Sequence, residues 1–510
     1  MDILFFLLSK NGKPRLLVRY MVFRSNRTPR KPFRRFVTKK NGNVRRMFRP
    51  WVERMADSQG PGQAKVADDK VKHPDLLILE RMRPLEEKVA KRKHGKTPEK
   101  LLARDALHEV LGQVFRNWLV VSVGHDDYTR IPGGVQVCIQ REQYLTNAAG
   151  GHYLNIHPWQ PLPRMAHECE DPDPVVVLVL DGVQVGTCRM SVLTEVLRTR
   201  AETGLRMLVT LHHLLGHSPE RITDMCRIAH PEDVFLWLHD FFTLCPGVRL
   251  QRNDLQFCGA PDLASNACGL CVYGPERVAH LDRMKGLFAE LAPKVIAPSQ
   301  VTLDFWESVA AFRVAGTRVV PHVTLEWVPR ADPDPVSDRP ADHTRIRVGF
   351  LGTAARHKGW PIFQRLSYMP ELADRFDFVA LTASKAELRG KAISVNVTPE
   401  HPNAMADAVR EQKIDLVLHW PDWPETFALT ALEAMEGGAF VVTNSGSGNV
   451  AASVRNYDRG VVLTDERALL DFFEGDAVEA LARRARETWA AFSVQIVPSR
   501  LSLAAFEETL

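Results

Sequence analysis

Two carboxylates stand at a spacing that could hold the two ends of one long ligand. Glu425 and Glu433 are eight positions apart, and good helix formers lie between them and Gly437. A helix that starts at Thr426 would place the two glutamates about 12 Å apart along its axis. The free backbone N–H groups at such a helix start suit a diphosphate. We therefore predict an anion-binding segment here, and two solvated carboxylates on a helix surface are the plain alternative.

A loop earlier in the chain carries two cations between glycines. Arg356 and Lys358 lie between Gly352 and Gly359, after an apolar run that is expected to form a strand. Lysine and arginine make charge-assisted hydrogen bonds to phosphate oxygens, and cations at this place would stabilise charge that builds on a leaving phosphate. The alternative for each cation is an ordinary side chain in water.

Three other places follow expected strands. Gly133 and Gly134 form a glycine pair that lets the backbone approach a ligand, or an ordinary turn. His239 and Asp240 could contact a ligand, although a histidine satisfied inside the fold is also consistent with the sequence. A histidine-rich stretch over residues 212–217 is interpreted as packing or acceptor-side structure.

Four of the eight cysteines are close together in the sequence, with two residues between the last pair. Four thiolates could hold a structural zinc, and reduced cysteines packed around a loop are the alternative. A disulfide scaffold is not expected from eight cysteines in 510 residues. The zinc candidates are Cys245, Cys258, Cys268 and Cys271.

Apolar runs of strand length alternate with helical patterns in two series. The first series begins at Trp118 and the second at Arg345, with a proline- and aspartate-rich linker between them. Such alternation predicts an α/β chain with two Rossmann-like, doubly wound domains that face a cleft. The expected units are residues 1–54 (basic 15-residue repeats), 55–116 (a helical connector), 117–335 (an N-terminal Rossmann-like domain), 343–490 (a C-terminal Rossmann-like domain) and 491–510 (a C-terminal helix).

The segment from Glu425 to Met435, together with the strand expected after it, resembles the E-x7-E motif of family-4-type retaining glycosyltransferases of the GT-B fold. The loop from Gly352 to Gly359 is similar to the family's loop after the first strand of the C-terminal half. Thr353 stands where the family usually has an arginine. The resemblance spans roughly residues 117–490. It implies that the first of the two Rossmann-like domains binds the acceptor and the second binds the donor.

The resemblance implies roles for particular residues. Glu425 would bind hydroxyls of the donor sugar, and Glu433 would bind the ribose. Lys358 would neutralise the diphosphate, with Arg356 in place of the missing arginine. The remaining implied residues are His239 for the donor sugar, Asp240 for the acceptor hydroxyl, and Gly133, Gly134, Gly352, Thr426 and Phe427 in the donor pocket.

The resemblance also implies a function. It indicates a hexosyltransferase-type enzyme of bacterial polysaccharide or glycolipid synthesis. The enzyme would move a sugar from a nucleotide-diphosphate donor to a glycan or lipid-linked acceptor, with no metal or other cofactor required. The alternatives are a nucleotide-sugar epimerase or sugar phosphorylase of the same fold, and a non-catalytic glycan-binding or scaffold protein.

The basic charge of the chain is concentrated at its start. Residues 1–50 contain 15 lysines and arginines and one acid, whereas the whole chain has a net charge of +5. Asn11, Asn26 and Asn41 mark a 15-residue period. Arginines interleaved with aromatic residues favour contact with an anionic membrane surface. A solvated tail and, less favoured, a nucleic-acid partner are the alternatives. We expect a cytoplasmic protein peripherally associated with the inner membrane, because no apolar run reaches the length of a membrane span.

Overall fold

The computed structural model describes residues 9–10, 13–14, 98, 100–112, 118–131, 133–329, 345–398 and 401–509. The chain divides into two units, Met1–Leu77 and Ile78–Leu510. In the first unit the described residues form strands β1 (Ser9–Lys10) and β2 (Lys13–Pro14), which pair in antiparallel fashion. The predicted repeats of residues 1–54 otherwise lie outside the described residues, as does most of the predicted connector.

The second unit contains an eight-stranded sheet in the order β12-β11-β8-β7-β3-β4-β5-β6. The strands from β12 to β4 pair in parallel, and β5 and β6 are added in antiparallel fashion. The strand bounds are β3 (Trp118–Val123), β4 (His152–Pro158), β5 (Val175–Leu180), β6 (Val183–Arg189), β7 (Arg206–Leu211), β8 (Asp233–Trp237), β11 (Lys294–Ala297) and β12 (Gly316–Val319).

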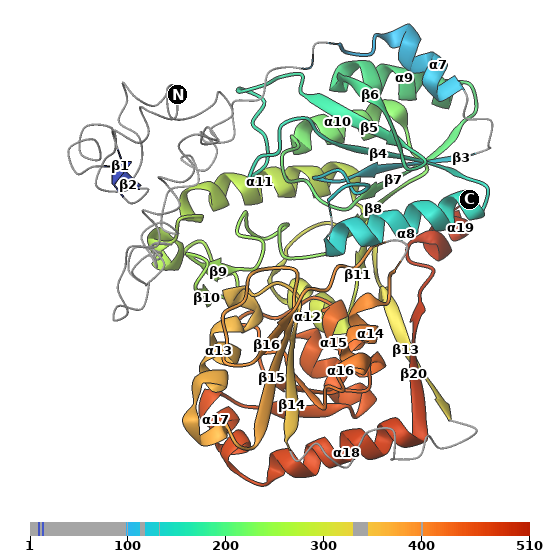
Figure 1. Cartoon of the computed structure of the whole chain (residues 1–510). Coiled ribbons are helices and arrows are strands. Elements are labelled where there is room, and N and C mark those ends of the chain that lie inside the picture. Colours follow the sequence, from blue (N-terminus) through green and yellow to red (C-terminus); the bar gives the residue numbers. More distant parts are fainter. Residues whose placement is uncertain are drawn as a thin grey trace. The chain divides into compact units, whose positions relative to one another are not determined.

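Alternate residues of the strands of this sheet enter two different cores. In β3, Leu119 and Val121 belong to one core, whereas Val120 belongs to the other. Helices therefore cover both faces, as Figure 1 shows. The helices of this part are α7 (Arg104–Gly112), α8 (Gly134–Ala148), α9 (Met190–Glu202), α10 (Pro219–Ala229), η2 (Asn266–Leu270), α11 (Gly274–Leu291) and α12 (Gln300–Val309), and β9 (Gln251–Arg252) pairs with β10 (Gln256–Phe257).

A second sheet has six strands, all parallel, in the order β16-β15-β14-β17-β18-β19. Its strands are β14 (Ile346–Leu351), β15 (Phe376–Leu381), β16 (Lys391–Ile393), β17 (Leu416–Leu418), β18 (Phe440–Asn444) and β19 (Gly460–Leu463). Its helices are η4 (Arg356–Lys358), α13 (Trp360–Tyr368), η5 (Pro370–Leu372), α14 (Ala404–Glu411), α15 (Leu429–Glu436), α16 (Asn449–Tyr457), α17 (Glu466–Glu474) and α18 (Ala477–Ala491).

The same alternation divides the second sheet between two cores. Val348 and Phe350 of β14 pack in one core, whereas Leu351 packs in the other. Two sheets built in this way confirm the predicted α/β class with two doubly wound, Rossmann-like parts. In open parallel sheets of this kind, ligands bind outside the carboxyl ends of the strands. That rule locates the places where a site should be sought.

The last residues of the chain differ from the helix expected over 491–510. They form strand β20 (Phe492–Pro498) and the short helix α19 (Leu503–Thr509). Strand β20 pairs in antiparallel fashion with β13 (Val323–Pro329) along its whole length, which satisfies its backbone groups as a strand. Helix α19 then packs Phe506 into a core of the eight-stranded sheet. Within the described part of the chain, no helix is long and apolar enough to cross a membrane.

Candidate functional site

The loop that carries Lys358 is fixed by backbone geometry. Lys358 ends η4, which follows β14 in the six-stranded sheet. Gly359 comes next, in the left-handed region with φ of 86°. A Cβ at this position would lie 2.2 Å from the carbonyl oxygen of Trp420. Only glycine fits here, so the loop packs closely against the chain after β17 and the position of Lys358 is set.

Glu425 does not lie on the predicted helix, and this part of the prediction is wrong. Helix α15 begins at Leu429, because Ala428 adopts φ of 61° in the left-handed region and interrupts the helical path. Glu425 instead forms an isolated bridge with Gly448, and its carbonyl oxygen accepts the N–H of Asn449 at 2.9 Å. The separation of about 12 Å along a helix axis therefore does not apply.

The structure nevertheless brings Glu425, Glu433 and Lys358 into one electrostatic neighbourhood. The two glutamates are only 8% and 7% exposed. Burial raises the pKa of Glu425, and Lys358 is the strongest opposing influence. Burial raises the pKa of Glu433 to about 7, with Glu436 raising it further and Lys358 and Arg141 lowering it. A lysine that acts on two buried carboxylates is the charge pattern of a ligand site rather than of a solvated surface.

Glu425 also carries an unsatisfied polar atom. Its Oε1 is buried and has no hydrogen-bond partner. Buried polar atoms are almost always paired, so an orphan next to a cation suggests a missing ligand group. His419, which follows β17, adds a buried imidazole whose pKa falls to about 3 through burial and the charge of Lys358. The surroundings of Lys358 are therefore largely shielded from water.

Arg356 is placed differently from Lys358. Its side chain is 48% exposed, and its Nε lies 3.8 Å from Oδ2 of Asp422. Asp422 in turn accepts a hydrogen bond from Gln251, which belongs to the short hairpin β9–β10. Gly352 adopts φ of 89° and lies against the start of α15, where a Cβ would be 3.6 Å from Cγ2 of Thr430. Of the two predicted cations, Lys358 is therefore the one beside the buried glutamates.

Thr426 and Phe427 join the two sheets. Thr426 Oγ1 donates a hydrogen bond of 2.7 Å to the carbonyl oxygen of His239, which follows β8. The carbonyl oxygen of Thr426 accepts hydrogen bonds from Ser299 and Thr302 at 2.8 and 3.1 Å. Phe427 packs edge-on against His322, with ring centroids 4.8 Å apart. These contacts connect the glutamate segment, residues 425–433, to the carboxyl end of β8.

His239 and Asp240 occupy different electrostatic environments. Burial and the neighbouring His212 hold the pKa of His239 well below its usual range, so its imidazole is neutral. Burial raises the pKa of Asp240, but His213 outweighs it and the net pKa is lowered. His213 Nε2 lies 3.2 Å from Asp240 Oδ2, and the N–H of Phe242 donates to Oδ1 at 2.8 Å. Asp240 is thus a structurally held carboxylate, whereas His239 is an uncharged ring.

The glycine pair opens the helix that contributes to this region. Gly133 precedes α8, which starts at Gly134. A Cβ on Gly133 would lie 2.2 Å from Oε1 of Gln136, whose Nε2 is 3.3 Å from His125 Nε2. The same helix carries Arg141, which acts electrostatically on both Glu433 and His322. Sequence reasoning missed Arg141, and its only signal was a charged position on the first helix after the glycine pair.

The four zinc candidates line one small pocket together with Arg277, whose Nη1 lies 2.9 Å from Cys268 Sγ. Burial raises the pKa of Cys245 to about 12. Zinc binding by these cysteines stays a prediction. In the part of the chain that the structure describes, Cys138, His239 and His322 form a group whose ligand atoms all lie within 4.8 Å of one another.

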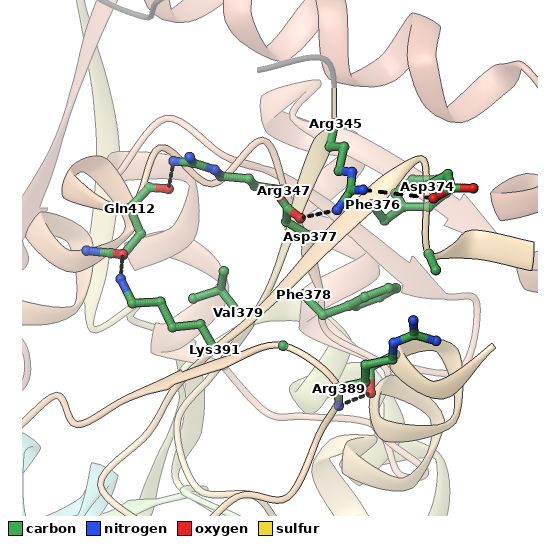
Figure 2. Close-up of a pocket in the computed structure, with 13 residues that line it drawn as sticks. Arg345, Arg347, Asp374, Phe376, Asp377, Phe378, Val379, Arg389, Lys391 and Gln412 are labelled. Carbon is green, nitrogen blue, oxygen red and sulfur yellow. Dashed lines mark hydrogen bonds and ion pairs between the residues drawn. The ribbon is translucent and has the colours of Figure 1, made fainter. Parts of the chain in front are cut away.

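A surface hollow of about 480 Å³ lies elsewhere on the six-stranded sheet. Figure 2 shows its lining, with Arg345, Arg389 and Lys391 among the labelled residues. Arg345 pairs with Asp374 and Asp377. This hollow lies at the amino ends of the strands, opposite to the end where ligands of such sheets bind. We do not assign it to the site.

No family model matches the chain, and no curated protein matches it significantly. Among solved structures, Anabaena HepE in complex with UDP-glucose is similar at 15% identity and a TM-score of 0.45, over 77% of this chain and 100% of that one. Sucrose-phosphate synthase from Thermosynechococcus elongatus is similar at 15% identity and 0.42, over 74% and 95%. Trehalose-phosphate synthase from Burkholderia vietnamiensis is similar at 12% and 0.38, over 72% and 92%. Structural similarity at this level supports no conclusion about function. A function has to be inferred from the residues of the site.

Proposed function

We propose that the chain is a retaining glycosyltransferase that moves a sugar, a hexose as the resemblance implies, from a nucleotide-diphosphate donor to a hydroxyl of a glycan or lipid-linked acceptor. The observation that carries this proposal is the meeting of Lys358 with two buried glutamates beyond the strand ends of the six-stranded sheet. A nucleotide sugar offers hydroxyls at both ends and a diphosphate between them, and this pattern of charges complements it.

The division of labour follows from the chemistry of each group. Lys358 would pair with the diphosphate and stabilise the negative charge that develops as the sugar–phosphate bond breaks. Glu425, with its unpaired Oε1, would accept hydrogen bonds from sugar hydroxyls. Glu433 would accept hydrogen bonds from the ribose. Cleavage of the donor bond and attack by the acceptor on the same face would retain the anomeric configuration, with the leaving phosphate accepting the acceptor proton.

His239 would complete the donor site from the eight-stranded sheet. It is neutral, and its carbonyl oxygen is tied to Thr426 in the glutamate segment. A neutral imidazole can hydrogen-bond a sugar hydroxyl without adding charge near the phosphates. Asp240, held by His213, would face the acceptor. The basic residues 1–54 would bring the enzyme to an anionic membrane surface.

The proposal is tested by nucleoside diphosphate release from a panel of nucleotide sugars. We expect release of UDP, GDP, dTDP or ADP from at least one donor, stimulated by an added glycan acceptor. A nucleotide-sugar epimerase would convert the donor without an acceptor and without release. A non-catalytic scaffold would release nothing from any donor, and either result would contradict the proposal.

A further inference from the structure

A chain of buried polar groups leads from helix α8 to His239. It begins at Glu142, whose side chain is fully buried. His212 Nε2 lies 3.0 Å from Glu142 Oε1, and His212 Nδ1 lies 2.9 Å from His239 Nε2. Glu142, His212 and His239 come from α8, from the residue after β7 and from the segment after β8. Three segments distant in the sequence thus meet in one line of hydrogen bonds.

Glu142 is held as an acceptor by every group around it. The hydroxyl of Tyr153 donates to Oε1 at 2.9 Å. The indole N–H of Trp237 points to Oε2 at 3.2 Å and can only donate. Ser502, just before α19, also donates to Oε2. A carboxylate that receives these donors leaves His212 Nε2 to act as a further donor.

The next hydrogen bond joins His212 to His239. Nδ1 of His212 and Nε2 of His239 share one hydrogen bond, so one of these two nitrogens carries the proton and the other accepts. The position of the proton on His239 is therefore tied to the position of the proton on His212. Stacking restrains the rotation of the ring: Trp237 lies 5.3 Å from His239 at 7°, and His322 lies 5.7 Å away at 22°.

We propose that Glu142 and His212 are positioning residues that fix the ring orientation and the tautomer of His239, so that its remaining ring nitrogen meets a hydroxyl of the donor sugar. Neither residue touches the donor in this arrangement. The inference rests on the proposed function, since it assigns the residues that orient His239 toward the sugar. It also gives His212 a role beyond the packing expected from its sequence context.

The kinetic test compares Glu142→Gln with Ser502→Ala. Glu142→Gln replaces an acceptor of the chain by an amide, and removal of an outer partner of a working histidine lowers activity by about 10- to 100-fold. Ser502→Ala removes a hydrogen bond to the same carboxylate off the path to His239. We expect the activity of Ser502→Ala to stay within about twofold of the wild type. Thermal unfolding of both variants separates a loss of fold from a loss of positioning, since both substitutions change a buried hydrogen-bond network.

Two further measurements separate positioning from a general structural role. In a His239→Ala background, Glu142→Gln should have no additional effect on kcat, because the series of hydrogen bonds from Glu142 through His212 then lacks the histidine that it positions. An equal loss in both backgrounds would overturn the proposal. Nitrogen NMR of labelled histidines should show His239 as a single tautomer in the wild type and a changed tautomer population in Glu142→Gln. An unchanged tautomer in Glu142→Gln would refute the chain even if no donor is turned over, whereas failure of the wild type on all donors would refute the proposed function alone.

Discussion

The two halves of the second unit contribute to the candidate site in different ways. The six-stranded half provides Lys358, Glu425 and Glu433 from two short stretches of sequence, each next to a glycine that packs against backbone. The eight-stranded half provides His239. Its ring is hydrogen-bonded to His212, which contacts Glu142, and Glu142 in turn contacts Trp237; these residues come from separate elements. The six-stranded half thus supplies the lysine beside the two glutamates, whereas the eight-stranded half supplies the neutral ring of His239 and, from α8, the cation Arg141. The first half should therefore dominate binding of the diphosphate, and the second should orient the sugar.

Replacement of Lys358 by alanine should have the largest effect. It removes the cation that opposes the charge of both glutamates and would pair with the leaving diphosphate. Loss of one preorganised group that stabilises developing charge typically costs about 10²- to 10³-fold in kcat. Steady-state kinetics with the active donor would measure it. The matched control is Lys391→Ala in the hollow of Figure 2, which should leave kcat unchanged. Equal kinetics for both lysine variants would contradict the assignment of the site to the carboxyl ends of the strands rather than to their amino ends.

A moderate effect is expected from Glu433→Gln, and it should depend on pH. Burial raises the pKa of Glu433 to about 7. The carboxyl is therefore protonated below that pH and becomes a carboxylate, able to accept from both ribose hydroxyls, above it. Donor affinity of the wild type should rise as pH increases through about 7, by roughly tenfold for one charge-assisted hydrogen bond.

The glutamine variant carries no titrating group at this position. Its donor affinity should be low and nearly constant across the same pH range, as calorimetric titration at several pH values would show. A variant that keeps the pH dependence of the wild type would assign that dependence to another group, and Glu433 would lose its role.

The smallest effect is expected from Arg356→Ala. Its guanidinium is half exposed and pairs with Asp422 at 3.8 Å, and exposed ion pairs contribute little. Turnover should fall by about threefold or less, which corresponds to well under 1 kcal/mol. A loss as large as that of Lys358→Ala, measured in the same assay, would show that Arg356 reorients onto the diphosphate. The two cations of the loop would then act as a pair.

The sequence predicted the site residues of the six-stranded half better than those of the eight-stranded half. Apolar runs such as those of β3 and β14 are long enough and buried enough to predict both sheets. The spacing of Glu425 and Glu433 and the Gly359 after Lys358 are local features, so the sequence indicated these residues together. The predicted start of the helix at Thr426 was wrong. Ala428 is a good helix former by propensity, but it adopts a left-handed φ, and Glu425 pairs with Gly448 instead of opening a helix.

Several residues of the eight-stranded half could not be predicted from the sequence. Glu142 and Arg141 lie on α8 with no motif around them. Apart from Tyr153, the residues that connect them to the site (His212, Trp237, Ser502 and Glu433) are 70 or more positions away in the sequence. A buried carboxylate is recognised only when its donors from several strands are known. The C-terminal strand β20 was missed for a similar reason, because its partner β13 precedes it by more than 150 positions.

Nucleotide binding tests the central claim most directly. Thermal unfolding of the wild type, Lys358→Ala and Glu433→Ala would be followed with UDP, GDP, dTDP and ADP. A ligand that binds only the folded protein raises its apparent stability by about 2.7 kcal/mol at a hundredfold excess over Kd. The account predicts that at least one nucleoside diphosphate raises the melting temperature of the wild type, and that this rise is lost in both variants. A rise of equal size in all three proteins, or none in the wild type, would contradict it.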